Sequence, residues 1–315
     1  MAGTSFLSTA NLSWGCKSMS LEVSKIQDLV ENQCLIDDSL VSAFIIGANP
    51  SKGARSPKLW NAAYEASGVQ GAMYPLDVPA ENLSTLLSTL QREDSVCAIA
   101  VAAPFKTEVA RWLGQRVTPV ARRSGSVNLL TRGVDGVFDG YNTDGLGALA
   151  ALREVTPSLE SKRVLVLGAG GTGRAVVSAL LEVLADRGNL FVANRNDLQR
   201  QWVKAVGAVP ISWQGLDSEV SQFDVVINCT TVGWGAQAEL SPLTPSQLSR
   251  LRHEVVVFDV VYQPVHTKLL QEARSRGLRC LGGGRMNLLQ AVTAFMLAHP
   301  SAHQETIAAA MEGTL

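Results

Sequence analysis

Histidine is scarce in this sequence, and its few copies are unevenly placed. All four lie in the last quarter of the chain, at His253, His266, His299 and His303. Many zinc sites and every Ser-His-Asp triad need histidine as a ligand or a base. Neither kind of site is expected in the first 250 residues, where chemistry must use Lys, Asp, Glu, Cys, Ser, Thr or Tyr. We expect no metal site.

The sequence also lacks an excess of charge and any long apolar run. It has 27 Lys and Arg against 28 Asp and Glu, which gives a net charge of −1. Nucleic-acid binders usually carry a clustered basic excess, and a membrane-spanning helix needs roughly 18 consecutive apolar residues. Since the chain has neither feature, we expect no nucleic-acid partner and no membrane partner.

Cysteines are few and scattered. The five cysteines form no CxxC pair, and they lie at Cys16, Cys34, Cys97, Cys229 and Cys280. An odd count without an apolar secretory signal indicates reduced thiols. We therefore predict a cytoplasmic location.

The chain is long and apolar enough for two folded domains. It has 315 residues, of which 46% are hydrophobic and 17% are charged, and this composition excludes a disordered chain. Short apolar runs alternate with amphipathic stretches, which is typical of a parallel α/β fold. We interpret residues 1–41, which precede this pattern, as an extension with a helix near Leu21–Val30.

The alternating pattern predicts strands and helices along the rest of the chain. The expected strands are Ser42–Gly47, Gly71–Leu76, Val96–Val101, Ser126–Thr131, Val137–Tyr141, Arg163–Leu167, Asn189–Asn194, Val225–Cys229 and Val255–Val261. The expected helices are Pro57–Ala66, Pro79–Leu90, Thr107–Leu113, Asn142–Arg153, Arg174–Arg187, Leu288–Leu297 and Ala302–Met311. Ser56 is expected to cap the first of these helices, with Pro57 in its first turn.

A glycine-rich segment follows the sixth expected strand. Gly168, Gly170 and Gly173 match G-x-G-x-x-G, with Gly171 and Thr172 between them. The match alone is weak, but a preceding strand and a following apolar helix give it the context of a dinucleotide site. The glycines allow a tight turn, a close approach to a pyrophosphate and close packing of helix and strand, and the helix N-terminus faces the anion. The alternative is a purely structural turn.

The end of the next strand indicates which dinucleotide binds. NAD enzymes usually place Asp or Glu about 20 residues after the loop, on the ribose 2′-hydroxyl. Here Asn194 lies 21 residues after Gly173 and is followed by Arg195. An arginine can pair with a 2′-phosphate through two parallel hydrogen bonds, which favours NADP. A solvated loop arginine is the alternative, and the nearby Asp197 keeps NAD as a second possibility.

Lys106 and Asp144 follow two other expected strands, and α/β proteins place their sites at strand ends. An isolated Lys or Asp is usually only a solvated charge. A functional role for these two residues therefore depends on the motifs around them. The motifs, in chain order, are Ser56-Pro57 with Asn61, Pro104-Phe105-Lys106, Ser126-Val127-Asn128, Asn142-Thr143-Asp144-Gly145, residues 168–175, Ala193-Asn194-Arg195, residues 228–233, residues 259–264, and Met286 with Gln290-Ala291. From about residue 42 to the C-terminus, this set resembles the shikimate/quinate dehydrogenase family.

The resemblance implies an N-terminal substrate domain, a Rossmann domain and C-terminal helices that pack back on the first domain. We place the substrate-binding and catalytic domain at 42–146 plus 288–315, and the Rossmann domain at 147–287. The implied reaction is reversible hydride transfer between a ring alcohol and NADP, with Lys106 and Asp144 bracketing the reacting oxygen. The chemistry of these two residue types supports this reaction. An ammonium stabilises and protonates a developing alkoxide, while a carboxylate orients the ammonium.

The resemblance also implies binding roles. Ring hydroxyls map onto Asn128, Asp144 and Gln290, the substrate carboxylate maps onto Ser56, and Tyr262 lies near the carboxylate end. Cofactor contacts are implied at Gly168, Gly170, Gly171, Thr172, Gly173, Asn194, Arg195, Thr230, Gly284 and Met286.

Three segments depart from the family pattern. The usual Ser-x-Ser-Pro reads Ala54-Arg55-Ser56-Pro57, the usual Asn-Val-Thr reads Ala100-Val101-Ala102, and Trp60 stands in place of a histidine. Groups that contact the substrate are thus partly lost, while the cofactor and catalytic motifs survive. We therefore expect a working oxidoreductase with an altered substrate.

Other functions stay open. Water, or Lys52, Arg55 and Lys58, can compensate for the lost groups, so that shikimate remains the substrate. An NAD-dependent quinate dehydrogenase is a second enzyme reading, and a non-catalytic sensor of a shikimate-like ligand is a third. Retention of Lys106 and Asp144 argues against the sensor. The expected partner is a small cyclic hydroxy acid or polyol, bound by a monomer or a homodimer.

Overall fold

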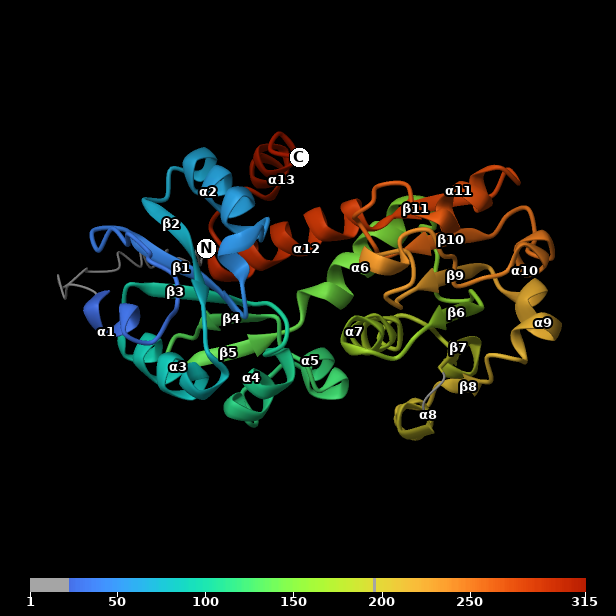
Figure 1. Cartoon of the computed structure of the whole chain (residues 1–315), viewed down its shortest axis with the longest axis horizontal. Coiled ribbons are helices and arrows are strands. Elements are labelled where there is room, and N and C mark those ends of the chain that lie inside the picture. The colour runs from blue at the N-terminus through green and yellow to red at the C-terminus, as the bar shows by residue number, and fades with distance from the viewer. Residues whose placement is uncertain (1–22, 195–196) are drawn as a thin grey trace, which may run out of the picture.

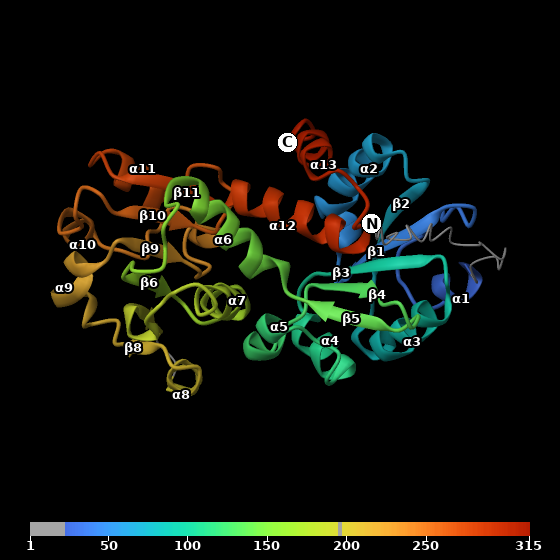
Figure 2. The same cartoon turned by 180° about the vertical axis from the view of Figure 1, so that it is seen from behind.

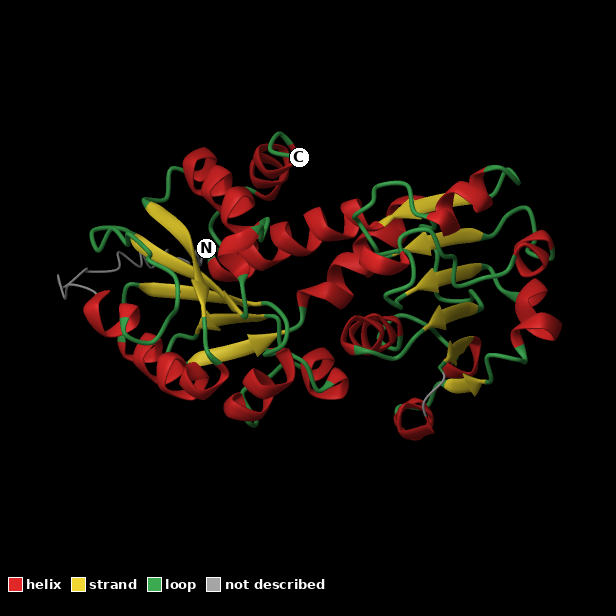
Figure 3. Ribbon diagram, viewed as in Figure 1, coloured by secondary structure: helices red, strands yellow, loops and turns green. Residues whose placement is uncertain are grey.

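Two β-sheets form the body of the protein. The computed structural model describes residues 23–194 and 197–315. Figure 1 shows the sheets side by side, with α6 (Thr143–Val155) and α12 (Gly283–Ala298) running between them. Figure 3 shows helices around both sheets, so the predicted α/β fold with two units is confirmed.

The first sheet has the strand order β2-β1-β3-β4-β5. Its strands are β1 (Val41–Gly47), β2 (Gly71–Asp77), β3 (Val96–Val101), β4 (Leu129–Arg132) and β5 (Phe138–Tyr141). β1 pairs in parallel with β2 and β3, whereas β4 is antiparallel to both β3 and β5. The carboxyl ends of β1, β2, β3 and β5 therefore share one edge, together with the amino end of β4.

Both faces of the first sheet are covered because alternate residues of a strand point to opposite faces. Phe44 and Ile46 of β1 face one apolar cluster, and Ala43 and Ile45 face another. The first cluster lies under α1 (Val23–Gln27), α3 (Leu83–Arg92), α4 (Lys106–Leu113) and α5 (Pro119–Ser124). The second lies under α2 (Ser56–Ser67), α13 (Gln304–Glu312) and α12.

The second sheet has the order β11-β10-β9-β6-β7-β8, and all of its pairings are parallel. Its strands are β6 (Val164–Leu167), β7 (Leu190–Ala193), β8 (Val209–Ile211), β9 (Val225–Asn228), β10 (Val256–Asp259) and β11 (Arg279–Gly282). Purely parallel strands are buried on both faces. One face packs on α6, α7 (Gly171–Leu180), α8 (Asp197–Ala205) and α12, and the other on α9 (Leu216–Glu219), α10 (Pro245–Ser249) and α11 (Lys268–Arg274).

Two glycines set how closely α6 packs on its neighbours. A Cβ on Gly145 would lie 2.4 Å from the backbone oxygen of Ala175 in α7. A Cβ on Gly147 would lie 2.8 Å from the backbone nitrogen of Gln290 in α12. Figure 2 shows α6 and α12 side by side from behind, as Figure 1 does from the front. The helix that carries Asp144 is thereby fixed against both α7 and α12.

Most predicted elements lie within a few residues of their expected positions, and β3 has its expected bounds. The predicted cap at Ser56 is wrong, because Ser56 is the first residue of α2 and Arg55 is the flanking residue. Arg55 already has α-helical dihedral angles and its carbonyl accepts from Leu59, so the first turn begins one residue early. The helix expected at 174–187 instead begins at Gly171, within the glycine loop, and ends at Leu180.

The pattern did not predict several short elements, each of 3 to 9 residues: α5, α8, β8, α9, α10, α11 and β11. The boundaries placed at residues 41, 146 and 287 stay predictions. In the described ranges, no helix is both long enough and apolar enough to cross a bilayer. The four cysteines within those ranges are free.

Candidate active site

The predicted site residues gather where the two sheets face one another. Lys106 follows the carboxyl end of β3, Asp144 follows that of β5, and Asn128 precedes the amino end of β4 at the same edge. The glycine loop follows β6, Thr230 follows β9 and Tyr262 follows β10. In Figure 3 the arrowhead of β5 and those of β6, β9 and β10 point toward one another.

Lys106 and Asp144 form an ion pair. Lys106 Nζ lies 2.6 Å from Asp144 Oδ2, and the two side chains are 29% and 15% exposed. The second carboxylate oxygen, Oδ1, accepts a hydrogen bond of 2.9 Å from Asn128 Nδ2. The structure thus places both predicted catalytic residues in one pair and attaches a predicted substrate residue to it.

A hydrogen-bonded chain extends this pair to α12. Asn128 Oδ1 accepts from the backbone N–H of Thr143 at 2.7 Å, and Asn128 Nδ2 donates to Thr143 Oγ1 at 3.0 Å. Thr143 Oγ1 in turn donates to Gln290 Oε1 at 3.0 Å. We call Lys106, Asn128, Thr143, Asp144 and Gln290 the catalytic network. Thr143 was not predicted as a site residue, although it lies inside a motif that was.

Asn142 fixes the start of α6. Its side-chain oxygen accepts from the backbone N–H groups of Asp144 and Gly145, at 3.1 and 3.4 Å. Its amide donates to the carbonyl of Ser126 at 3.0 Å. This is the N-cap geometry that asparagine favours, and it sets the position of the Asp144 backbone. A preference for asparagine at helix starts was the sequence signal that could have identified this role.

The glycine loop has the form that a dinucleotide site needs. Gly168 has a φ of +93°, which favours glycine. A Cβ on Gly173 would meet the backbone oxygen of Gly168, so helix and strand could not pack as they do. A Cβ on Gly170 or Gly171 would meet none of the described residues within 4 Å. No side chain among those residues caps the start of α7, so its first N–H groups can bind an anion.

Of the other predicted cofactor residues, Asn194 contacts this loop, whereas Gly284 and Met286 lie in a separate helix. Asn194 is 8% exposed, and its side-chain oxygen accepts from the backbone N–H of Ala169 at 3.2 Å. This bond fixes the backbone of the glycine loop to the end of β7. Gly284 and Met286 lie in the first turn of α12, where Gly284 faces open space and Met286 is buried. Arg195 lies outside the described residues.

Thr230 lies against the glycine loop and is held there by buried groups. Its Cγ2 lies 2.9 Å from where a Cβ on Gly168 would be. Asn228 Oδ1 accepts from the backbone N–H and the hydroxyl of Thr230, and Asn228 Nδ2 donates to Asp259 Oδ1 at 2.9 Å. Burial raises the pKa of the Asp259 carboxyl to about 6. Asn228 and Asp259 lie in motifs of the sequence, but neither was predicted as a site residue.

Of the residues that depart from the family pattern, Trp60 is buried in α2, and the three alanines lie at the same edge of the first sheet. Ala54, Ala100 and Ala102 are half-buried and pack on the apolar cluster under α2. Ser56 is half-buried at the start of α2. Tyr262 is 37% exposed, and the guanidinium carbon of Arg55 lies 5.0 Å from its ring centroid. We call the three alanines with Arg55, Ser56 and Tyr262 the substrate edge.

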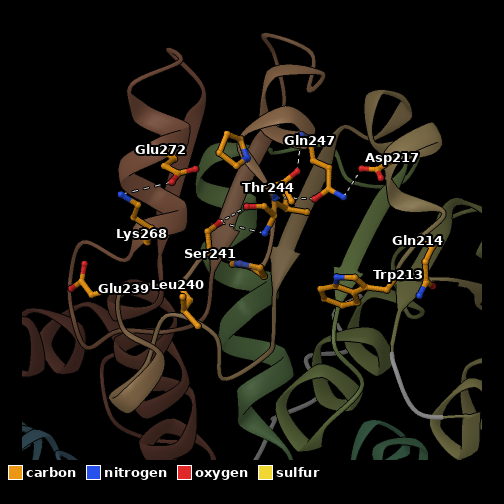
Figure 4. Close-up of a pocket in the computed structure, with 13 residues that line it drawn as sticks. Trp213, Gln214, Asp217, Glu239, Leu240, Ser241, Thr244, Gln247, Lys268 and Glu272 are labelled. Atoms are coloured by element: carbon orange, nitrogen blue, oxygen red, sulfur yellow. Dashed lines mark hydrogen bonds and ion pairs between the residues drawn. The ribbon is translucent and has the colours of Figure 1, made fainter.

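A separate hollow of about 560 Å³ lies among α9, α10 and α11 on one face of the second sheet (Figure 4). Trp213, Asp217, Gln247 and Glu272 are among its lining residues, and none of the predicted site residues is. Gln247 is already bonded to Asp217 and Thr244. In the described parts of the chain, no group of three or more His, Cys, Asp or Glu is arranged to hold a metal ion.

Comparison with known proteins identifies the family of this chain. The shikimate dehydrogenase substrate binding domain matches residues 45–130, and the shikimate/quinate 5-dehydrogenase domain matches residues 150–261. A shikimate dehydrogenase (NADP⁺) of Moorella thermoacetica is 36% identical over 258 residues, which cover 79% of this chain and 85% of that protein. The same enzyme of Geobacillus kaustophilus is 34% identical over 251 residues, 78% of this chain and 88% of that one.

A solved structure is similar over most of the chain. It is the shikimate 5-dehydrogenase of Thermus thermophilus in complex with NADP(H) and shikimate. That structure is 28% identical, superposes with a TM-score of 0.74, and covers 88% of this chain and 100% of its own.

Proposed function

Because this chain belongs to the shikimate/quinate dehydrogenase family, we propose that it is an NADP-dependent oxidoreductase. It interconverts a cyclic, shikimate-like polyol and its 3-dehydroshikimate-like ketone. The relatives named above are NADP-dependent shikimate dehydrogenases, which supports the reaction class and the cofactor. The observation that carries the proposal is the Lys106–Asp144 ion pair of 2.6 Å at the facing strand edges.

We assign to Lys106 the transfer of a proton to and from the reacting oxygen. An ammonium near the reacting oxygen stabilises negative charge as the ketone is reduced and then donates a proton to it. Asp144 keeps the ammonium in position through Oδ2, while Asn128 occupies Oδ1 and limits rotation of the carboxylate. In the oxidation direction the same lysine, once neutral, accepts the hydroxyl proton.

The second sheet fits the cofactor. Open space at Gly170 and Gly171 and the start of α7 suit a pyrophosphate. Thr172 and Thr230 are half-buried beside this space, and buried Gly173 lets α7 pack closely on the loop. NADP, when bound, supplies or accepts the hydride. The chain's part is to hold the dinucleotide and to orient the ring carbon beside Lys106.

The substrate is proposed to differ from shikimate. Ser56 and Tyr262 remain for a carboxylate, and Asn128, Asp144 and Gln290 remain for ring hydroxyls. Ala54, Ala100 and Ala102 replace hydroxyl and amide groups with half-buried methyl groups. A ligand hydroxyl that loses its partner on burial costs roughly 1–3 kcal/mol. A ring alcohol with a smaller or less polar group toward Ala54 and Ala102 is therefore favoured.

A turnover assay tests the reaction. The protein is mixed with NADP⁺ and a panel of cyclic alcohols that includes shikimate and quinate, and absorbance of the reduced nicotinamide is followed. We expect a steady rise with at least one alcohol, and little or none when NAD⁺ replaces NADP⁺. Binding of a panel member without turnover would instead identify a sensor, and faster turnover of quinate with NAD⁺ would identify a quinate dehydrogenase. The cytoplasmic location and the monomeric or homodimeric state also stay proposals.

A further inference from the structure

Arg55 connects the substrate edge of the first sheet with the second sheet. The loop that follows β1 lies beside the loop that leads to Lys106, because Ala102 donates to the carbonyl of Ile46 at 2.8 Å and Ala48 to that of Ala103 at 3.3 Å. Arg55 ends this loop and is half-buried. Its guanidinium reaches the ring of Tyr262, which follows β10 of the other sheet. One side chain thus spans from the first sheet to the second beside the catalytic network.

The charge of Arg55 has no acidic partner among the described residues. Ion pairs join other arginines of these ranges to carboxylates, as Arg116 pairs with Asp135 and Arg285 with Glu154. The guanidinium of Arg55 contacts the Tyr262 ring, and Arg55 also lines a small hollow with Lys58 and Thr314. A guanidinium that stacks on an aromatic face keeps its N–H groups directed outward in its own plane, where they match the two oxygens of a carboxylate.

The two neighbouring cations differ from Arg55 in their contacts, although Lys58 lines the same small hollow. Lys58 Nζ donates to the carbonyl of Thr314 at 2.5 Å, which directs it toward the C-terminal residues. Lys52 is exposed in the turn after β1. Both add positive charge to the approach of an anionic ligand, but only Arg55 touches a group of the second sheet at this edge.

From these contacts we infer that Arg55, held on the Tyr262 ring, binds the carboxylate of the substrate. The inference rests on the proposed function and refines it. The substrate is a ring alcohol that carries a carboxylate, and the alanines change only which ring substituents are accepted. Binding of the anion also ties the two sheets together, because Arg55 and Tyr262 come from different sheets.

Binding of shikimate and of its uncharged methyl ester tests the inference. Affinities are measured by calorimetry on the full chain with NADP⁺ present, for the wild type, Arg55→Met, Arg55→Lys and Lys58→Ala. We expect the wild type to bind the acid at least about 10-fold more tightly than the ester. Arg55→Met should weaken the acid by about 10- to 150-fold, the range for hydrogen bonds to a charged group, and change the ester by less than about twofold.

The two other variants separate position from charge. Arg55→Lys retains the charge but not the planar fork, so it should preserve part of the preference for the acid. Lys58→Ala removes a charge three residues away and should leave the preference unchanged. The inference is overturned if the wild type binds acid and ester equally, if Arg55→Met weakens both alike, or if Lys58→Ala abolishes the preference. Failure of the proposed function would look different, because the preference would persist while no ring alcohol in the panel is turned over.

Discussion

The catalytic network and the substrate edge lie beside each other but are built differently. In the catalytic network, each polar group has a partner, from Lys106 through Asp144 and Asn128 to Gln290. At the substrate edge, three methyl groups stand where the family pattern has polar groups, and Arg55 has no carboxylate partner within the described residues. A protein that had lost its chemistry would be expected to lose the first set, not the second.

Under the proposed function the two regions have different tasks. Lys106 and Asp144 of the network protonate the reacting oxygen, and Asn128 and Gln290 bind ring hydroxyls that every substrate carries. The substrate edge selects among the other ring substituents. Changes in the network should therefore lower turnover for every substrate, whereas changes at the substrate edge should alter the order of preference among substrates.

The largest effect is expected from Lys106→Ala. Loss of the ammonium should lower kcat by about 10² to 10⁴, the usual range for a general acid or base, with little change in cofactor affinity, because the charge acts on the reacting oxygen. Steady-state kinetics and NADP⁺ titration measure the two quantities.

The matched control for Lys106 is Arg111→Ala. Arg111 is an exposed cation on the same helix, α4, and alanine suits a helix, so kcat should stay near the wild-type value. Near-normal turnover in Lys106→Ala would show that the network is not catalytic.

A smaller effect is expected from Arg195→Ala. The loss of charged hydrogen bonds to the 2′-phosphate should raise KM for NADP by about 10- to 150-fold, which corresponds to roughly 1.5–3 kcal/mol. KM for NAD should hardly change. Arg187→Ala, at an exposed arginine before β7, is the control. Equal shifts for the two cofactors would remove the 2′-phosphate role from Arg195.

The smallest effect concerns the packing behind the substrate edge. His299 Nε2 lies 3.2 Å from the Tyr64 hydroxyl, its ring packs on Phe295, and burial lowers its pKa from 6.5 to about 4. Between these values the unfolded chain binds more protons than the folded one. The free energy of unfolding should therefore fall as the pH drops from about 6.5 to 4, by on the order of 2 kcal/mol.

Urea unfolding across this pH range measures the effect. His299→Phe should lose this part of the pH dependence, whereas His303→Gln, at an exposed position before α13, should retain it. An unchanged slope in His299→Phe would mean that His299 is not kept neutral by its burial.

The sequence predicted the parts of the protein that depend on local pattern. The apolar run before Gly168 and the glycines after it predicted β6, the loop and a following helix, although that helix begins at Gly171 and not at Arg174. The motif that contains Asp144 placed it at a helix start, where Asn142 caps the helix. Lys106 and Asp144 are 38 residues apart, and only the order of the strands brings them to 2.6 Å.

Long-range contacts account for what the sequence did not predict. The contact between Arg55 and Tyr262 joins two sheets, so no local pattern contains it. The link from Thr143 to Gln290 depends on how closely α6 and α12 pack at Gly147. Short elements such as α10 and β8 have too few residues to show a period.

The ratio kcat/KM for shikimate in the wild type and in Ala54→Ser/Ala102→Thr tests the contrast between the two regions most directly. Ala308→Ser, which adds a hydroxyl on α13, is the control and should change nothing. We predict that the wild type oxidises shikimate below about 10⁴ M⁻¹s⁻¹, the lower edge of ordinary enzyme efficiency. The double variant should gain about 30-fold or more, because two hydroxyl contacts of roughly 1–3 kcal/mol each are restored. A wild type at or above that value, with no gain in the double variant, would contradict the account.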